Sequence, residues 1–582
     1  MTLNVDSPRQ RWLLPALTLF TFFFLLGSRG LNEPDEGRYA EIAREMIVLD
    51  DWLVPRLWYL PHLDKPPLTY WSVAVSISVF GRNEWAVRLP LALAAISGVW
   101  AGCRFGRALG GPRVGLWTGL ILQSSLLYFV MARMLTTDLI LTQFIAWAVY
   151  FFWQSWRCLD RGATDAPANR RRLVREFFGW HLAGWASVAL GFLTKGPIAM
   201  VVPLVSLGAL AAVRRRDGPP GKILLAGMAA GLVLFGALAG PWFWLVFARV
   251  PGASRYMVVG QVIGHALGTA IKNRGGHPLY YFAILGVGFL PWTVLLGWLW
   301  RRAHWRRLNR PQQDAWVMLS VWVLFTFVLF SLTRAKLPAY ILPIFPALAL
   351  MMALRFFPAE PGANTPSAPR WAWRVCMMSA PGLMLVIPVV VPLIFHIEES
   401  MGLKVQAGIA VAAFALLAWR GRAFANAQCA VAAVALGLLN LQLTAAGAPS
   451  VETSLKRNQT LKPVGLALQQ AWHPGVTLVC WGRLPQGLPF YSGEVISATN
   501  QPLFGGMALN QVPFEFPGNS EKIGDRLLPD EGALTRLLAE NRPVLVVGVA
   551  GSLARFQQLL RPTPLTLVAR VGQWELFANR QK

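Results

Sequence analysis

Charge is scarce in this chain of 582 residues, because only 14% of its residues are Asp, Glu, Lys or Arg whereas 55% are hydrophobic. This composition excludes an intrinsically disordered chain and is too apolar for an ordinary soluble enzyme. Acidic residues are the rarer sign, with 28 Asp and Glu against 54 Lys and Arg, a formal net charge of +26. Such an excess suggests nucleic-acid binding in a soluble protein, so the positions of the basic residues decide its meaning.

Cysteine and the common nucleotide motifs are also nearly absent. The five cysteines are odd in number and far apart, which argues against a disulfide framework and against a cysteine metal site. The chain contains no G-x-x-x-x-G-K-[ST], no G-x-G-x-x-G and no D-x-D pattern. ATP-driven transport is therefore unsupported, and a sugar donor held by this protein is expected to be a membrane lipid and not a nucleotide.

Long apolar runs are abundant instead. A helix needs about 20 mainly apolar residues to cross a membrane, and such runs recur along the chain. The first is preceded by Arg9 and Arg11 and lacks a small-residue cleavage site, so it is expected to be retained. The thirteen predicted spans are 12 to 28, 86 to 105, 112 to 130, 138 to 156, 177 to 194, 197 to 213, 223 to 248, 279 to 300, 315 to 332, 339 to 355, 375 to 396, 404 to 419 and 424 to 446.

The basic residues predict the orientation of these spans. Lys and Arg accumulate in cytoplasmic loops, and the densest clusters, at residues 170–172 and 214–216, fall on the side that also holds the N-terminus. This topology signal accounts for nearly all of the clusters, so nucleic acid is not an expected partner. An odd number of spans places the chain after residue 450 on the outer side.

The tail differs from the rest of the chain. Residues 476–481, 543–548 and 565–569 are predicted to be buried strands, and residues 532–540 and 552–560 are predicted to be helices. We therefore expect a membrane domain over 1–449 and a small outer α/β domain over 450–582. The tail carries no metal, nucleophile or phosphate-loop motif, which favours a structural, acceptor-guiding or interaction role.

The first outer loop, residues 29–85, carries most of the unexplained polar residues. After Pro34 it takes helical periodicity, which predicts an amphipathic helix on the membrane surface, and a second helix is predicted at residues 68–80. Asp35 and Glu36 at its start would suit a helix cap equally well. The loop also holds Lys65 in a proline-stiffened segment, and a carboxylate with a lysine suits the handling of a lipid phosphate.

Further polar residues lie at other outer ends. Each alone is more typical of a snorkelling or capping residue, but together they predict one electropositive site for a phosphate or pyrophosphate substrate. The second long outer loop, residues 249–278, is expected to contribute with the first. The candidates outside the first loop are Arg133, Asp138, Lys195, Arg255, His265, Lys272, Arg274, His277, Arg334, Lys336 and Tyr340.

Six stretches of this sequence resemble one family. Residues 34–46 with 51–55 and 65–71 resemble the first periplasmic loop of bacterial aminoarabinose transferases, which are C-type glycosyltransferases related to protein O-mannosyltransferases. Residues 194–196, 241–242 and 336–343 are similar to later stretches of that family. The resemblance implies a C-type glycosyltransferase fold with about 13 transmembrane helices and periplasmic amphipathic helices, in the bacterial inner membrane.

The resemblance also implies an activity. Such enzymes move 4-amino-4-deoxy-L-arabinose from undecaprenyl phosphate to lipid A phosphate at the periplasmic face, giving resistance to polymyxin and cationic antimicrobial peptides. Direct displacement would invert the anomeric centre. The resemblance implies a catalytic group of Asp35, Glu36 and Asp138. The substrate-binding residues predicted for the lipid phosphate and sugar are Arg38, Tyr39, Asp64, Lys65, Arg133, Lys195, Arg255, Arg274, Lys336 and Tyr340.

Several alternatives stay open at this stage. No cofactor is clearly required, but a zinc or magnesium ion between Glu84 and His265, or between His62 and Asp64, is an alternative without recognised ligand spacing. The transferred sugar could be another polyprenyl-linked hexose or hexosamine, and the acceptor lipid A or a protein Ser/Thr. A transporter of lipid-linked sugars would need the same helices and charges. We expect a monomer that meets membrane lipids.

Overall fold

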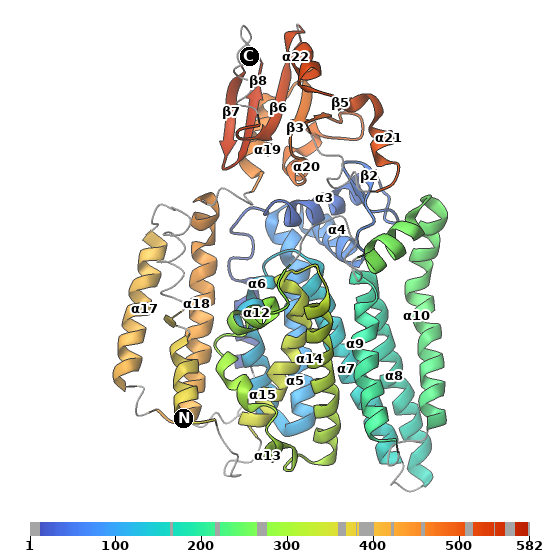
Figure 1. Ribbon diagram of the computed structural model, residues 1–582, viewed down its shortest axis with the longest axis vertical. Helices are drawn as coiled ribbons and strands as arrows, with labels where there is room; N and C mark the ends of the chain where they lie inside the picture. The colour runs from blue at the N-terminus through green and yellow to red at the C-terminus, as the bar shows by residue number, and fades with distance from the viewer. Residues whose placement is uncertain are drawn as a thin grey trace.

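A computed structural model describes residues 12–162, 167–215, 221–264, 276–358, 368–379, 381–382, 401–420, 424–454, 460–506, 516–540, 542–552 and 565–579. Within these residues the protein is mostly helical, with a bundle of long helices at one end and a β-sheet at the other (Figure 1). The helices of the bundle are α2 (Leu13–Phe23), α5 (Glu84–Gln123), α6 (Leu126–Met131), α7 (Thr137–Gly162), α8 (Pro167–Lys195), α9 (Ile198–Val213), α10 (Gly221–Arg249), α12 (Tyr280–Gly288), α13 (Arg302–Trp305), α14 (Arg310–Leu332), α15 (Phe345–Phe356), α17 (Met401–Arg420) and α18 (Asn426–Ser454). Three short turns of other helix types interrupt them, namely η1 (Arg255–Ile263), η2 (Thr293–Trp298) and η3 (Pro338–Ile344).

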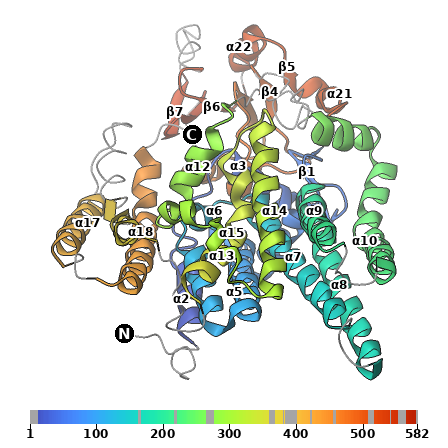
Figure 2. The same ribbon diagram turned by 60° about the horizontal axis from the view of Figure 1, so that its bottom comes forward.

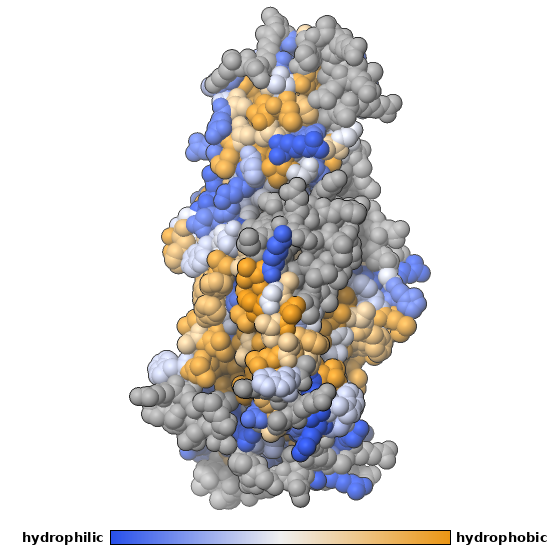
Figure 3. Space-filling model, turned by 90° about the vertical axis from the view of Figure 1, so that its left-hand side faces the viewer, coloured by the Kyte–Doolittle hydropathy of each residue, from blue (hydrophilic) through white to orange (hydrophobic). Residues whose placement is uncertain are grey.

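Five of the described helical segments are long and apolar enough to cross a membrane, and they are Glu84–Gln123, Arg170–Lys195, Gly221–Arg249, Arg310–Leu332 and Pro338–Phe356. On the face drawn in Figure 3, apolar side chains gather at mid-height, with hydrophilic side chains above and below them. The protein is therefore a multi-pass membrane protein, as predicted, whereas the exact number of thirteen spans stays a prediction.

The spans predicted at 86 to 105 and 112 to 130 are two arms of a helical hairpin. The backbone leaves helical geometry at Gly110 and Gly111, next to Pro112, in the middle of α5. The arms then pack closely, because a Cβ on Gly115 would lie 2.7 Å from the carbonyl oxygen of Cys103. The second arm ends at Gln123, and the short α6 continues the predicted run.

Two other predicted spans differ from the structure. The single span predicted at 279 to 300 is wrong, because α12 ends at Gly288 and the 3-10 helix η2 begins only at Thr293. Pro291 lies between them and lacks the backbone N–H that a continuous helix requires. The span at 375 to 396 lies largely outside the described residues, of which 370–379 are helical.

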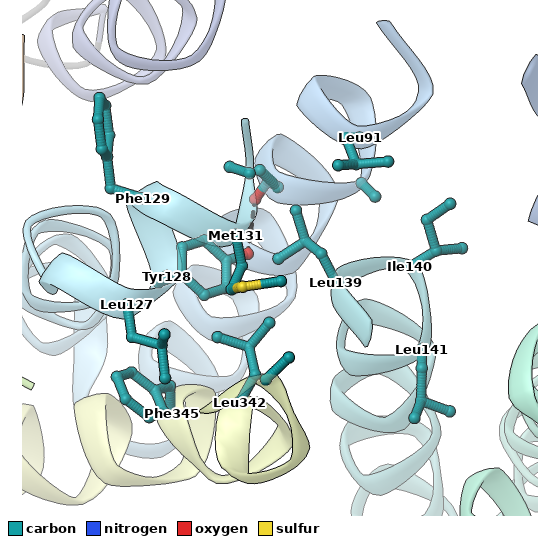
Figure 4. Packing of buried hydrophobic residues seen from close by; sticks show 14 of the residues in the cluster. Leu91, Leu127, Tyr128, Phe129, Met131, Leu139, Ile140, Leu141, Leu342 and Phe345 are labelled. Atoms are coloured by element: carbon teal, nitrogen blue, oxygen red, sulfur yellow. Dashed lines mark hydrogen bonds between the residues drawn. The ribbon is translucent and has the colours of Figure 1, made fainter. Parts of the chain in front are cut away.

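Close packing holds the centre of the bundle. Figure 2 shows α5, α7, α14 and α15 at the centre, with α10 on one flank and α17 and α18 on the other. Leu127 and Tyr128 of α6 meet Leu139 of α7 and Leu342 and Phe345 near the start of α15 (Figure 4). These contacts fix the ends of α7 and α15 from which candidate site residues project.

The C-terminal region forms a mixed β-sheet with strand order β5-β4-β3-β6-β8-β7. Strands β3 to β6 pair in parallel, whereas β8 pairs antiparallel with β6 and β7. The three predicted strands are present, but β7 is not buried as predicted, because Leu567 and Val568 are exposed. The helix predicted at 552–560 lies largely outside the described residues. The elements are α19 (Lys462–Ala471), β3 (Thr477–Trp481), α20 (Leu488–Ser492), η5 (Gly493–Val495), β4 (Leu503–Gly505), α21 (Asn519–Ile523), η6 (Gly524–Arg526), β5 (Leu527–Leu528), α22 (Glu531–Ala539), β6 (Val544–Val549), β7 (Thr566–Val571) and β8 (Trp574–Ala578).

Two further helices, α3 (Asp35–Val48) and α4 (Leu68–Phe80), lie between the bundle and the sheet, with the short hairpin β1 (Arg56–Leu57) and β2 (Leu60–Pro61) (Figure 1). Both helices were predicted, but α3 is not a surface helix with one wet face, because Glu41, Arg44 and Glu45 on its polar face are buried as well. Arg44 donates to both oxygens of Glu41 at 2.7 and 2.8 Å and to the Tyr59 hydroxyl. The Tyr59 hydroxyl donates to the Ile496 carbonyl in the C-terminal region. The C-terminal region thus covers the face of α3 that was expected to meet the membrane surface or water.

Candidate functional site

Asp35 and Arg38 form an open ion pair at the first turn of α3. The Arg38 Nη2 atom lies 2.5 Å from the Asp35 Oδ1 atom, and the Asp35 side chain keeps 52% of its surface exposed. The other guanidinium branch of Arg38 donates to the Gln486 Oε1 atom at 3.3 Å. Helix geometry brings residues three apart onto one face, so the pair follows from the sequence, whereas its contact with the C-terminal region does not.

Glu36, by contrast, is a buried anchor. Its carboxylate lies 2.6 Å from Arg29 and 2.9 Å from Arg88 and accepts from the backbone N–H groups of Asn32 and Leu135. Burial would raise the pKa of Glu36, but Arg29 and Arg88 outweigh it and lower the pKa to about 2. Its predicted catalytic role stays a prediction, and these contacts favour a role in holding the start of α3 against α5 and α7.

A second carboxylate, Asp64, lies close to the first pair. Its Oδ1 atom accepts from the Tyr256 hydroxyl at 2.5 Å and from Gln261 at 3.3 Å, so the loop after α10 closes over the first outer loop. The adjacent Lys65 donates to the Asp64 carbonyl oxygen at 3.0 Å. Lys65 thus contacts the backbone of Asp64, and its implied place near the lipid phosphate stays a prediction.

Tyr39 connects these groups. It stacks on Tyr70 of α4 with ring centroids 5.4 Å apart. Burial raises the pKa of Tyr39, Arg38 opposes that rise, and the carboxylates of Asp35, Asp138 and Asp64 add to it. Three predicted acids from three different segments therefore lie within electrostatic reach of one buried phenol.

Asp138, in the first turn of α7, forms an ion pair with Lys195 at the end of α8. The Lys195 ammonium lies 4.6 Å from the ring centroid of Tyr340 on η3. Lys336 lies nearby along the chain, where its ammonium donates to the carbonyl oxygens of Phe330 and Ser331 and lies 5.2 Å from the ring of Tyr281. The start of α7, the end of α8 and the segment that follows α14 therefore lie close together, as one shared site would need.

The remaining predicted binding residues are placed differently. The Arg133 guanidinium donates to the carbonyl oxygens of Thr21 and Phe24 and to Gln442, which favours a role in joining α2 and α18. Arg255 is exposed at the start of η1, one residue before Tyr256. Arg274 and His265 lie outside the described residues.

The residues considered for a metal ion have other partners or lie outside the described residues, as His265 does. The Glu84 carboxylate lies 2.8 Å from the Lys462 ammonium and accepts from the Tyr491 hydroxyl, so it joins α5 to the C-terminal region. His62 lies 3.9 Å from Asp64. Among the residues that the structure describes, no three His, Cys, Asp or Glu side chains cluster as metal ligands. These donors do not fit a zinc or magnesium ion.

An apolar groove of about 610 Å³ lies between α4, α5 and α7. Its lining includes Leu68, which follows Lys65 by three residues in the chain, and Ile140, which follows Asp138 by two. The charged residues described above do not line the groove themselves.

Sequence reasoning missed several residues of this site. Tyr70, Tyr256, Gln261 and Tyr281 carry no net charge, so counting charged residues in outer loops did not select them. Gln486 lies in a tail that holds no catalytic motif. Tyrosines within the most specific stretches, such as Tyr70 in residues 65–71, were the available signal.

Comparison with known proteins first identifies the class of fold, a membrane glycosyltransferase. Residues 64–244 match the family model described as dolichyl-phosphate-mannose-protein mannosyltransferase. The arabinosyl transferase of Pseudomonas aeruginosa that is named for undecaprenyl phosphate-α-4-amino-4-deoxy-L-arabinose is 34% identical over 351 residues, which are 60% of this chain and 59% of that relative. A second transferase of that name, from Sodalis glossinidius, is 32% identical over 352 residues, 58% of each chain. These matches span less than two thirds of the curated relatives.

The particular fold is that of ArnT. The crystal structure of ArnT from Cupriavidus metallidurans bound to undecaprenyl phosphate matches this chain with a TM-score of 0.78 and 25% identity, covering 99% of both chains. The resemblance predicted from the first outer loop is thereby confirmed, and the chain is an ArnT-like membrane protein. The likeness includes the C-terminal sheet, which the sequence resemblance did not reach.

Proposed function

We propose that this protein is a pentosyltransferase that moves 4-amino-4-deoxy-L-arabinose from undecaprenyl phosphate to a lipid A phosphate. The proposal places the reaction at the periplasmic face of the bacterial inner membrane, where the product would confer resistance to polymyxin. The names of the similar proteins support the donor and the sugar. The ArnT structure with bound undecaprenyl phosphate supports the lipid carrier.

One observation carries the proposal. The Asp35 and Arg38 pair, the Asp64 and Lys65 segment and the Asp138 and Lys195 pair come from four separate stretches of chain, and Asp35, Arg38, Asp64 and Asp138 act electrostatically on Tyr39. A polyprenyl phosphate needs a cationic site for its phosphate next to an apolar path for its chain. The groove of about 610 Å³ between α4, α5 and α7 supplies such a path.

The reaction breaks the bond between the sugar anomeric carbon and the undecaprenyl phosphate oxygen. A lipid A phosphate oxygen forms the new bond from the opposite face, so the configuration inverts and the electron pair of the broken bond stays on the leaving phosphate. Lys65 and Arg38 are placed to stabilise the charge that grows there. Lys195 is held near by Asp138 and supplies a third cation.

Asp35 is not required as a general base in this reaction. A phosphate monoester has a second pKa near 6 by analogy with phosphoserine, so a lipid A phosphate is already anionic near neutral pH. With half of its side chain exposed, Asp35 is available to the sugar amine or to the acceptor, and it fixes the orientation of Arg38. We therefore assign it a positioning and substrate-binding role.

The C-terminal region completes the proposed site. We place residues 1–449 in the transferase domain and residues 450–582 in a periplasmic domain, although α18 continues to Ser454. Gln486 contacts Arg38, and Tyr491 contacts Glu84, so this region is positioned to close one side of the site. The acceptor lipid would enter from the membrane, and the protein is proposed to act as a monomer.

A reconstituted assay tests the proposal. Purified protein in liposomes with undecaprenyl phosphate-aminoarabinose and lipid A should yield modified lipid A, detected by mass spectrometry. Asp35→Asn and Lys65→Met should each reduce the rate at least tenfold, whereas Asp525→Asn, an exposed position in the C-terminal region, should match the wild type. Absence of product from wild-type protein that binds the donor would refute the proposal.

The broader family match supports a second candidate, because the family model over residues 64–244 is described by mannose transfer to protein. Exchange of the donor for a polyprenyl-phosphate hexose or hexosamine, with a Ser/Thr peptide as acceptor, separates the two candidates. A lipid-linked sugar transporter would instead move donor across the vesicle membrane without any transfer product. Asp35→Asn would then alter flux alone.

A further inference from the structure

Four basic side chains gather at the end of the bundle opposite the C-terminal sheet. Arg301, His304 and Arg307 lie in and around the short helix α13, which Figure 1 shows at the foot of the molecule. Arg355 joins them from the last turn of α15. This end is predicted to face the cytoplasm, so it is separate from the proposed transferase site.

Arg355 is the unusual member of the cluster. Only 1% of its surface is exposed, and its Nε atom makes a long contact of 3.5 Å with the Trp298 carbonyl oxygen. Its Nη1 and Nη2 atoms are buried without a hydrogen-bond partner. Within the described part of the chain no carboxylate forms an ion pair with Arg355 or Arg301. A guanidinium stays protonated in proteins, so burial without an anion is costly.

His304 lies near Arg355 and is also buried with an unsatisfied nitrogen atom. It is 5% exposed, and its Nε2 atom is buried without a hydrogen-bond partner. Burial, together with the charges of Arg355 and Arg307, lowers the pKa of His304 to about 4. The imidazole is therefore neutral at pH 7 and offers one N–H donor among the neighbouring arginines.

A cavity of about 340 Å³ is lined by Arg301 and His304 together with Trp300, Trp305 and Trp316. Arg355 does not line this cavity itself, but its charge acts on His304, which does. Trp side chains are typical of the membrane interface, where lipid headgroups meet the hydrocarbon core. A cavity with cationic groups and an apolar wall suits a ligand that carries both a phosphate and acyl chains.

The topology signal explains only part of the cluster. Arg301 and Arg307 are exposed at a predicted cytoplasmic end, where basic residues are expected. An exposed arginine would set the orientation of the protein in the membrane as well as a buried one, so the topology signal does not explain why Arg355 is buried with two unsatisfied nitrogen atoms. We propose that Arg355, His304 and Arg301 form a binding site for a phosphate group, supplied by an anionic phospholipid of the inner leaflet.

Lipid titrations of the purified full-length protein test this site. Phosphatidylglycerol, phosphatidylcholine and inorganic phosphate are added separately in detergent, and the thermal unfolding temperature and the lipids retained in native mass spectrometry are recorded. Phosphatidylglycerol should raise the unfolding temperature of the wild type, whereas phosphatidylcholine should not. Arg355→Met should weaken the phosphatidylglycerol effect at least tenfold, because it removes charge-assisted hydrogen bonds.

The same variant makes a second, opposite prediction. Without added lipid, Arg355→Met should unfold at or above the wild-type temperature, because it removes an uncompensated buried charge. Arg301→Met serves as a milder variant with an intact core, and Arg215→Met, an exposed arginine of another loop, is the matched control that should match the wild type.

The outcomes separate the sources of the phosphate. An equal effect of inorganic phosphate and phosphatidylglycerol, lost in Arg355→Met, would keep the anion site but assign it to free phosphate. A phosphatidylglycerol effect that survives in both Arg355→Met and Arg301→Met would overturn the site, as would a lower unfolding temperature of lipid-free Arg355→Met.

Discussion

The closest approach between α3 and the C-terminal region lies at two glycines, Gly37 and Gly487. A Cβ atom on Gly37 would lie 2.8 Å from the Gly487 Cα atom, 3.0 Å from its nitrogen and 2.1 Å from the Glu33 Oε1 atom. The Gly487 N–H group donates to that same Glu33 oxygen at 2.7 Å. Because the obstructing atoms are mostly backbone, Gly37→Ala must push the two segments apart.

The expected cost follows from these distances. Overpacking of this kind costs about 1 to 3 kcal/mol. Ala is favoured over Gly inside a helix by about 1 kcal/mol, so a net loss would show that the close approach dominates over helix propensity. Separation would also stretch the Arg38 to Gln486 contact of 3.3 Å. We therefore expect Gly37→Ala to lower both the unfolding temperature and the transfer rate. The transfer rate should fall about tenfold for each 1.4 kcal/mol by which the displaced Arg38 raises the reaction barrier.

Two variants bracket this prediction. Gly487→Ala should act in the same direction, because its Cβ would lie 2.7 Å from the Gly37 Cα atom. Gly236→Ala in α10 is the control, since nothing lies within 4 Å of its Cβ, and it should leave activity unchanged and stability equal or higher. Thermal unfolding of purified protein and the liposome transfer assay measure both quantities. If Gly37→Ala and Gly236→Ala behave alike in both assays, the docking of the C-terminal region on α3 is refuted.

Three further predictions concern buried charges near α3. Burial raises the pKa of Glu33 to about 8 from its ordinary 4.5. The protonated Glu33 carboxyl therefore contributes its full stabilisation below pH 4.5, and this stabilisation is lost as the pH rises to 8. Glu33→Gln should remove this loss in a pH series of thermal unfolding. The pKa of Glu36 is lowered to about 2, so the ionised Glu36 carboxylate stabilises the fold fully above pH 4.5 and this stabilisation is lost as the pH falls. Glu36→Gln should cost about 3 to 5 kcal/mol at pH 7 in the same assay, because Arg88 would lose its carboxylate partner. Lys195→Met should lower kcat more than Lys195→Arg does in the transfer assay, because only Lys195→Arg keeps a cation beside Asp138. Equal losses of kcat in the two variants would contradict a role for the positive charge at residue 195.

The sequence predicted local features well. Pro34 and the acids after it predicted where α3 begins, and short, mainly apolar runs predicted β3 and β6. Each of these signals depends on neighbours within a few residues. The hairpin of α5 was equally visible, because Gly110, Gly111 and Pro112 cannot continue a helix without a break.

Features that depend on distant segments were not predictable in this way. Glu41, Arg44 and Glu45 give α3 a polar face that indicates solvent, yet a region more than 400 residues later covers that face. Asp64 likewise gains Tyr256 and Gln261 from a loop about 190 residues away. No local pattern in one sequence specifies such pairings.

The contrast between two neighbouring ion pairs indicates where the chemistry occurs. Glu36 and Arg88 are both fully buried, and removing one partner of such a pair costs about 3 to 5 kcal/mol, so a substrate phosphate would compete poorly for Arg88. The Asp35 side chain is 52% exposed whereas Arg38 is only 14% exposed, so a substrate phosphate, under the proposed function, would reach this pair from the Asp35 side and replace Asp35 on Arg38. The displaced carboxylate is then available to the sugar amine. One residue of separation on α3 therefore distinguishes a fixed anchor from an exchangeable substrate contact, and it favours Asp35 and Arg38 over Glu36 as the groups that meet the substrate.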